Sequence, residues 1–221
     1  MNQLAYNIAH LIGAVILMSS FALLYQRRLT AVVSIFVVQA VALTAAAAWQ
    51  AHIQDDSIHL YSSAAVILVF KVVFVPIALR WLIRKLGVQK TVETTLGVNM
   101  SLMLGVALVG LSILLVLPVT VEAGSLSRET LALAMSVVLL SFLTMITRRN
   151  AITQVVGFMA LENGLLLAAV SAEGMPFVVE ISIAFSVLIA MTLFGIFFFR
   201  IRERFDSLDI GYLETFRGDR S

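Results

Sequence analysis

Apolar stretches of about 20 residues, the length that crosses a bilayer as a helix, alternate with short polar segments along the whole chain. Seven stretches are predicted to be helical, at residues 4–24, 29–49, 58–83, 96–117, 126–146, 151–171 and 177–199. An α-helix rises about 1.5 Å per residue, so each stretch can cross a hydrocarbon core of about 30 Å. The pattern predicts an all-α integral membrane protein with about seven transmembrane helices.

Composition supports a membrane location and narrows the chemistry. Hydrophobic residues make up 61% of the 221 residues, only 13% are charged, and the mean hydropathy is +1.02. A soluble domain carries about 25% charged residues. The chain has no cysteine, which excludes a disulfide, a Cys-ligated iron–sulfur cluster and a thiolate zinc site. Only His10 is expected at membrane depth, whereas His52 and His59 lie at or next to a loop. A haem held between two helices is therefore disfavoured, and no cofactor is expected.

Basic residues occupy alternate loops and so predict the orientation of the chain. They are Arg27, Arg28, Arg84, Lys85, Lys90, Arg148, Arg149 and five arginines after residue 199. Arg and Lys concentrate on the cytoplasmic side of membrane proteins, so the N-terminus is expected outside and the C-terminus in the cytoplasm. The net charge of +2 says little about partners, because nearly all of the basic residues lie at helix ends. The lipid bilayer is an expected partner, and nucleic acid is not.

A weak internal repeat suggests how the chain is organised. The first and fifth stretches both end in an Arg-Arg pair, 121 residues apart, and run directly into the next stretch. This predicts two three-helix units in parallel orientation, residues 1–95 and 126–199, joined by a connecting helix within 96–125. Coincidence is the alternative, because short basic turns are common in membrane proteins. The tail, residues 200–221, is apolar enough to favour docking on a neighbouring protein over disorder, with an interfacial anchor as the simpler alternative.

Two charged residues near the middle of apolar stretches are the strongest candidates for chemistry. Glu162 lies about 16 Å from either end of its predicted helix, and Lys71 is equally central in another. An ionisable side chain at bilayer depth costs roughly 2.5–3.5 kcal/mol on insertion scales, so each needs a protein partner, water or a proton-transfer role. Pro76, five residues after Lys71, removes a backbone donor and loosens that helix. The structural alternatives are a neutral, hydrogen-bonded glutamate and a static ion pair that fixes helix packing.

Four further residues are candidates for a proton relay. Gln39 and Asn163 could hydrogen-bond water near the midplane, although each could also join helices. Glu180, one turn into the last stretch, could admit or release protons. Alternatively, it could lie there because the helix dipole stabilises an acidic residue near a helix N-terminus. His10 could titrate near neutral pH, although a packing hydrogen bond is the favoured interpretation. The sequence contains no phosphate-binding glycine loop, His-Glu-x-x-His motif or nucleophile elbow, so the chain is not expected to be an enzyme alone.

Several motifs together resemble the hydrogenase-4 component E family. They are Phe70-Lys71-Val72-Val73-Phe74-Val75-Pro76, Arg148-Arg149-Asn150, Gly157, Glu162-Asn163-Gly164, Val179-Glu180-Ile181, Leu208-Asp209 and Arg217-Gly218. The last three stretches are also similar to the K subunit of respiratory complex I and the C subunit of multisubunit cation/proton antiporters. The chain departs from these proteins because Glu162 falls about three residues later. It also lacks a second glutamate in the middle of the last stretch.

The resemblance implies a subunit in the membrane arm of a complex I-like or hydrogenase-4-like assembly in a prokaryotic inner (plasma) membrane. It implies antiporter-like membrane subunits and a peripheral hydrogenase or related oxidoreductase as partners. The implied activity is translocation of protons, or alternatively sodium, with Gln39, Lys71 and Glu162 near the midplane. Two other hypotheses stay open: an assembly scaffold whose buried charges only fix packing, and a stand-alone seven-helix transporter or receptor.

Overall fold

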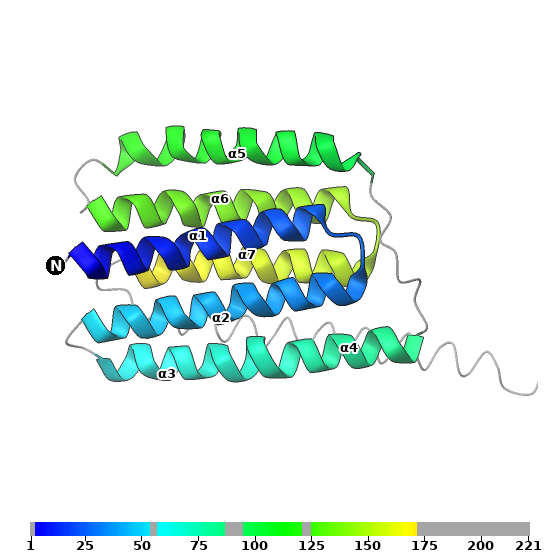
Figure 1. The fold of residues 1–221 in the computed structure, drawn as a ribbon, viewed down its shortest axis with the longest axis horizontal. Helices are drawn as coiled ribbons and strands as arrows, with labels where there is room; N and C mark the ends of the chain where they lie inside the picture. The colour runs from blue at the N-terminus through cyan, green and yellow to red at the C-terminus, as the bar shows by residue number, and fades with distance from the viewer. Residues whose placement is uncertain (1–2, 54–56, 87–94, 121–124, 172–221) are drawn as a thin grey trace, which may run out of the picture. The chain divides into compact units, whose positions relative to one another are not determined.

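Every regular element that the computed structural model describes is helical (Figure 1). The described residues are 3–53, 57–86, 95–120 and 125–171, all within the unit Met1–Ile183. The elements are α1 (Gln3–Tyr25), α2 (Leu29–Ile53), α3 (Ser57–Ile67), the π-helical segment η1 (Leu68–Phe74), α4 (Val75–Leu86), α5 (Val98–Val119), α6 (Ser125–Thr147) and α7 (Ala151–Ser171). The all-α prediction is thus confirmed for these residues. The seventh predicted stretch, 177–199, and the tail, 200–221, lie outside them.

Six helices in the described part of the chain are long and apolar enough to cross a membrane. They comprise Tyr6–Tyr25, Leu29–His52, Ala64–Trp81, Val98–Pro118, Arg128–Thr147 and Ile152–Val170. The third is built from α3, η1 and α4, which follow one another without a break. Each of the six corresponds to one of the predicted stretches, with ends that differ by a few residues at most sites.

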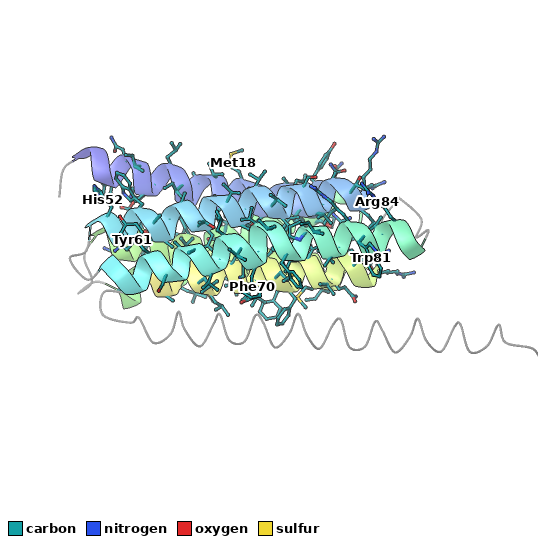
Figure 2. All side chains as sticks on the ribbon, turned by 90° about the horizontal axis from the view of Figure 1, so that it is seen from below. Met18, His52, Tyr61, Phe70, Trp81 and Arg84 are labelled. Carbon is teal, nitrogen blue, oxygen red and sulfur yellow. The ribbon has the colours of Figure 1, made fainter. Side chains whose placement is uncertain are left out.

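Two helical hairpins, α1–α2 and α6–α7, lie side by side (Figure 1). Helix α1 packs on α6, and α2 packs on α7, while α5 covers α6 and the α3–η1–α4 helix covers α2. The turns after α1 and α6 and the end of α4 lie at the same end of this unit. Figure 2 places Arg84 at that end and His52 at the other. The sidedness expected from the basic residues is therefore present, while the direction in a membrane and the division into repeated units stay predictions.

Close contact between α6 and α7 depends on glycine. A β-carbon at Gly157 would lie 2.8 Å from the Cγ of Met145, and one at Gly164 would lie 2.9 Å from a methyl carbon of Val138. Real β-carbons essentially never approach other atoms so closely. The two glycines are seven residues apart, so they lie on one face of α7 and let the two backbones approach.

Two buried apolar clusters lie on either side of a polar layer, which consists of the buried residues Ser20, Gln39, Lys71, Glu162 and Asn163. One cluster includes Ile16, Leu43, Ile67 and Leu166. The other includes Leu23, Phe36, Val75, Val156 and Ala160. On α1, α2, the third helix and α7 alike, residues of one cluster precede a polar position and residues of the other follow it. The apolar packing therefore holds four helices in register around that layer.

Candidate functional site

The polar layer consists of five buried side chains from four helical segments. They are Ser20 of α1, Gln39 of α2, Lys71 of η1, and Glu162 and Asn163 of α7, each at most 4% exposed. Four of the six predicted relay residues are among them. Polar groups so deeply buried are stable only when they are paired, so their contacts decide what the layer can do.

Lys71 is carried by a π-helical segment just before a proline. At its end, the Val75 N–H donates to the Phe70 carbonyl, five residues back, instead of four. Pro76 has no N–H, and its ring collides with the carbonyl of residue 72 in a regular α-helix. Widening the preceding turns relieves that collision. The predicted loosening near Pro76 therefore takes the form of a π-helical segment, which is rare in proteins and frequent at functional sites.

The outer and inner faces of this helix differ in chemistry. Figure 2 shows Tyr61, Phe70 and Trp81 along the length of α3, η1 and α4, and all three are exposed. Lys71 is 2% exposed and lies against α7. Within η1, the one charged residue therefore lies on the inward face.

The ammonium of Lys71 lies between two neighbouring side chains of α7. Its Nζ donates a hydrogen bond to Asn163 Oδ1 at 2.8 Å. The same atom forms an ion pair with Glu162 Oε1 at 3.3 Å. The two α7 residues are about 100° apart around the helix axis, yet both reach one cation.

A directed row of hydrogen bonds continues from Asn163 across two further helices. Asn163 Nδ2 donates to Gln39 Oε1 at 3.2 Å, and Gln39 Nε2 donates to Ser20 Oγ at 2.8 Å. The Ser20 hydroxyl donates to the Ile16 carbonyl at 3.1 Å. Every donor in the row points away from Lys71, and the row ends at a backbone carbonyl of α1.

Glu162 differs from the other members because its oxygens are not satisfied. Within the described residues, the carboxyl oxygens accept no hydrogen bond apart from the ion-pair contact with Lys71. A buried carboxyl group with spare acceptor capacity can take up a proton or bind a further donor. In the same part of the chain no group of three or more His, Cys, Asp or Glu residues could hold a metal ion.

Known proteins of two kinds are similar to this sequence. It is 27% identical over 208 residues to the uncharacterised protein Rv0085 of Mycobacterium tuberculosis, which covers 91% of this chain and 92% of that protein. It is 27% identical over 164 residues to hydrogenase-4 component E of Escherichia coli K12, which covers 74% of this chain and 75% of that protein. Hydrogenase-4 component E of Shigella flexneri matches to the same extent. No family model and no solved structure matches the chain.

The similarity to hydrogenase-4 component E loosely supports the resemblance seen in the motifs. The likeness of the last three stretches to the complex I K subunit and the antiporter C subunit stays a prediction. So do the relay roles of the individual residues.

The structure places the remaining predicted residues elsewhere. His10 Nε2 lies 2.9 Å from Glu129 Oε2 of α6, an ion pair when the imidazole is protonated, and both side chains are partly exposed. Ten residues of α1, about 15 Å, separate His10 from Ser20. Glu180 lies outside the described residues. His10 is therefore not part of the polar layer.

Ser20 and Arg148 are two residues whose buried contacts the sequence did not reveal. Ser20 gives no signal because a hydroxyl in an apolar helix barely changes the hydropathy. Arg148 was expected at the cytoplasmic surface, but it is 2% exposed and donates from Nη2 to the Leu23 and Leu24 carbonyls at the end of α1. Burial, and secondarily the nearby charge of Arg27, lower the pKa of Arg148 from its ordinary value. This side chain ties the α6–α7 turn to α1 and satisfies its last carbonyls.

Proposed function

We propose that this chain is a membrane subunit of a hydrogenase complex and that it takes part in moving protons across the membrane. Six apolar helices of membrane-spanning length and the similarity to hydrogenase-4 component E fit such a subunit. The proposal places the N-terminus outside, the C-terminus in the cytoplasm, and a seventh helix at 177–199. Antiporter-like membrane subunits and a peripheral hydrogenase or related oxidoreductase are its proposed partners.

The buried pair Lys71–Glu162 is the observation that carries this proposal. Lys71 lies seven and ten residues from the ends of Ala64–Trp81, and Glu162 ten and eight residues from the ends of Ile152–Val170. Both are thus about 10–15 Å from either end, too far for the charges to reach a lipid headgroup. Groups at that depth mark proton or ion pathways in membrane proteins.

Two protonation states of the pair have the same net charge. Ammonium beside carboxylate and amine beside carboxylic acid differ by one proton moved between Nζ and Oε1, two atoms that are 3.3 Å apart. A proton can therefore shift within the pair without placing extra charge in the low-dielectric interior. Net transfer then needs one site outside the pair that supplies a proton and one that takes a proton away. The Glu162 oxygens, which accept no hydrogen bond from the described residues apart from the contact with Lys71, can receive the proton that enters.

The ammonium also bears on the choice of ion. Sodium binding at Glu162 would require several oxygen ligands around the cation, and the Nζ of Lys71 already occupies the position beside Oε1. A second positive charge there would be repelled. The geometry therefore favours protons over sodium as the transported ion.

Proton translocation per electron in membrane vesicles tests the proposal. We expect Glu162→Gln and Lys71→Ala to lower this ratio when it is normalised to the amount of assembled complex. Glu129→Gln, which changes a carboxylate that is 45% exposed at its side chain, serves as the control and should leave the ratio unchanged. An unchanged ratio in Glu162→Gln at normal assembly would refute the relay.

A scaffold role is the second candidate, because the same contacts join η1, α2 and α7. If packing is their only purpose, the Glu162 and Lys71 variants will reduce the amount of assembled complex and leave the ratio per complex at its wild-type value. The two roles therefore separate in one set of vesicles.

A further inference from the structure

Lys71 has a neutral acceptor next to its charged one. The shorter of its two contacts, 2.8 Å, is with the Asn163 amide oxygen, and the longer, 3.3 Å, is with Glu162. An amide oxygen has the same charge and acceptor capacity whether or not its neighbour is protonated. The ammonium therefore keeps a partner when Glu162 becomes a neutral acid.

The orientation of this acceptor agrees with both ends of the hydrogen-bond row, because the Lys71 ammonium can only donate and the Ser20 hydroxyl accepts from Gln39. The Ser20 hydroxyl gives its only proton to the Ile16 carbonyl, so it can only accept from Gln39. Gln39 must then turn its Nε2 toward Ser20 and its Oε1 toward Asn163, and Asn163 must turn its Oδ1 toward Lys71. A flip of either amide would bring two donors or two acceptors face to face.

Amides in this row hold hydrogen bonds but do not pass protons. The Asn and Gln NH₂ groups are donors that do not ionise, and their oxygens are acceptors only. A proton arriving at Lys71 therefore cannot leave through Asn163 and Gln39 toward α1. It can leave through Glu162, through another ionisable group or through water.

We propose that Ser20, Gln39 and Asn163 form an amide holder, a polarised hydrogen-bond row that keeps the Lys71 ammonium beside Glu162 through the proton cycle. The inference rests on the proposed relay function and assigns Gln39 and Asn163 as positioning residues. The holder closes the α2 and α1 side of the layer to protons. It also makes proton uptake by Glu162 possible without leaving a buried ammonium unpaired.

The decisive variant is Asn163→Asp in the assembled complex. It keeps the shape and the oxygen acceptor toward Lys71, but it replaces a neutral partner of Lys71 by a charged one and removes the donor to Gln39. The ammonium is then held by a permanent charge when Glu162 is protonated. We expect proton translocation per electron, at equal assembly, to fall toward the value of Glu162→Gln. A wild-type ratio in Asn163→Asp would overturn the holder.

A matched pair of serine variants tests the far end of the row. Ser20 and Ser141 are both buried and both donate to the carbonyl four residues back, but only Ser20 also accepts from Gln39. Ser20→Ala should lower the ratio, by less than Asn163→Asp, and Ser141→Ala should not. Equal ratios in the two serine variants would contradict the inference.

Infrared difference spectra of the complex during turnover provide a readout that a packing role does not move. The carboxylic acid band of Glu162 is assigned by its loss in Glu162→Gln. This band should be present in wild type and lost in Gln39→Met, because that variant removes the acceptor of the Asn163 Nδ2 hydrogen bond without changing the charge. Persistence of the band at wild-type size would overturn the holder. If Glu162→Gln itself leaves the ratio unchanged, relay and holder both fall; if it lowers the ratio and the Asn163 and Ser20 variants do not, only the holder falls.

Discussion

The coupling free energy between Lys71 and Glu162 can be measured by a double-mutant cycle. Two unit charges 3.3 Å apart attract by about 5 kcal/mol at an effective dielectric constant of about 20. Removing one partner strands the other charge, and breaking a buried pair in this way costs about 3–5 kcal/mol. Removing both leaves no charge to strand. We expect Lys71→Met with Glu162→Gln to cost no more than either single variant, and therefore at least about 3–5 kcal/mol less than their sum.

The assay is unfolding of the purified chain by sodium dodecyl sulfate in mixed micelles at neutral pH, which gives the free energy of unfolding of each variant. Lys71→Met combined with Glu129→Gln is the control, because Glu129 pairs with His10 and Lys71 pairs with Glu162 and Asn163, so the two residues share no partner. Their effects should be additive within about 0.5 kcal/mol. Hydrogen bonds between membrane helices average about 0.6 kcal/mol in such cycles. A Lys71–Glu162 coupling no larger than that would refute the ion pair as the main bond of the polar layer.

Contacts outside the polar layer make three further variants informative in the same assays. Arg148→Met removes hydrogen bonds from a charged donor, worth about 1.5–3 kcal/mol each, so the free energy of unfolding should fall. Arg148→Lys should recover only part of the lost free energy, and full recovery would contradict the contact with two carbonyls. His10→Gln breaks a partly exposed pair and should cost at most about 1 kcal/mol while proton translocation per electron stays unchanged, whereas a lower ratio would place His10 in the pathway. Gly164→Ala sets a methyl group 2.9 Å from Val138 and 3.1 Å from a backbone oxygen of α6 and should cost about 1–3 kcal/mol; Gly110→Ala, which meets open space, should stabilise by about 0.5–1 kcal/mol, and equal effects would show that α6 and α7 are not in tight contact.

The six described helices and the main charged residues of the site are visible in the sequence for simple reasons. Continuous apolar stretches leave little choice but helices, and Glu162 and Lys71 stand out because a charge in such a stretch is costly. Their contact is not predictable from position alone, because depth along a helix does not say which way a side chain faces. Asn163 shows the difference: it lies beside Glu162 in sequence, and only the packing of η1 and α2 against α7 turns both residues toward one ammonium.

Residues whose polarity is easily satisfied are the ones that sequence patterns miss. Ser20 is nearly neutral on a hydropathy scale, and its position in the hydrogen-bond row depends on the contact of α1 with α2. Arg148 is conspicuous in the sequence, but its burial is not predictable. The excess of Arg and Lys in cytoplasmic loops predicts on which side of the membrane a helix end lies, and it does not predict whether the side chain is buried. Its contacts with the α1 carbonyls follow from the packing of α1 against α6.

The polar layer is hard to explain by stability alone. Replacing a buried ion pair by well-packed apolar residues is often neutral or stabilising, so packing between the two apolar clusters does not require Lys71 or Glu162. The π-helical segment that carries the lysine adds further cost, and so do the glutamate oxygens, which accept no hydrogen bond from the described residues apart from the contact with Lys71. The two assays separate the explanations: a large coupling energy with unchanged proton translocation would assign the pair to assembly. A large coupling energy with lost translocation would mean that the Lys71–Glu162 pair both holds the helices together and takes part in proton transfer.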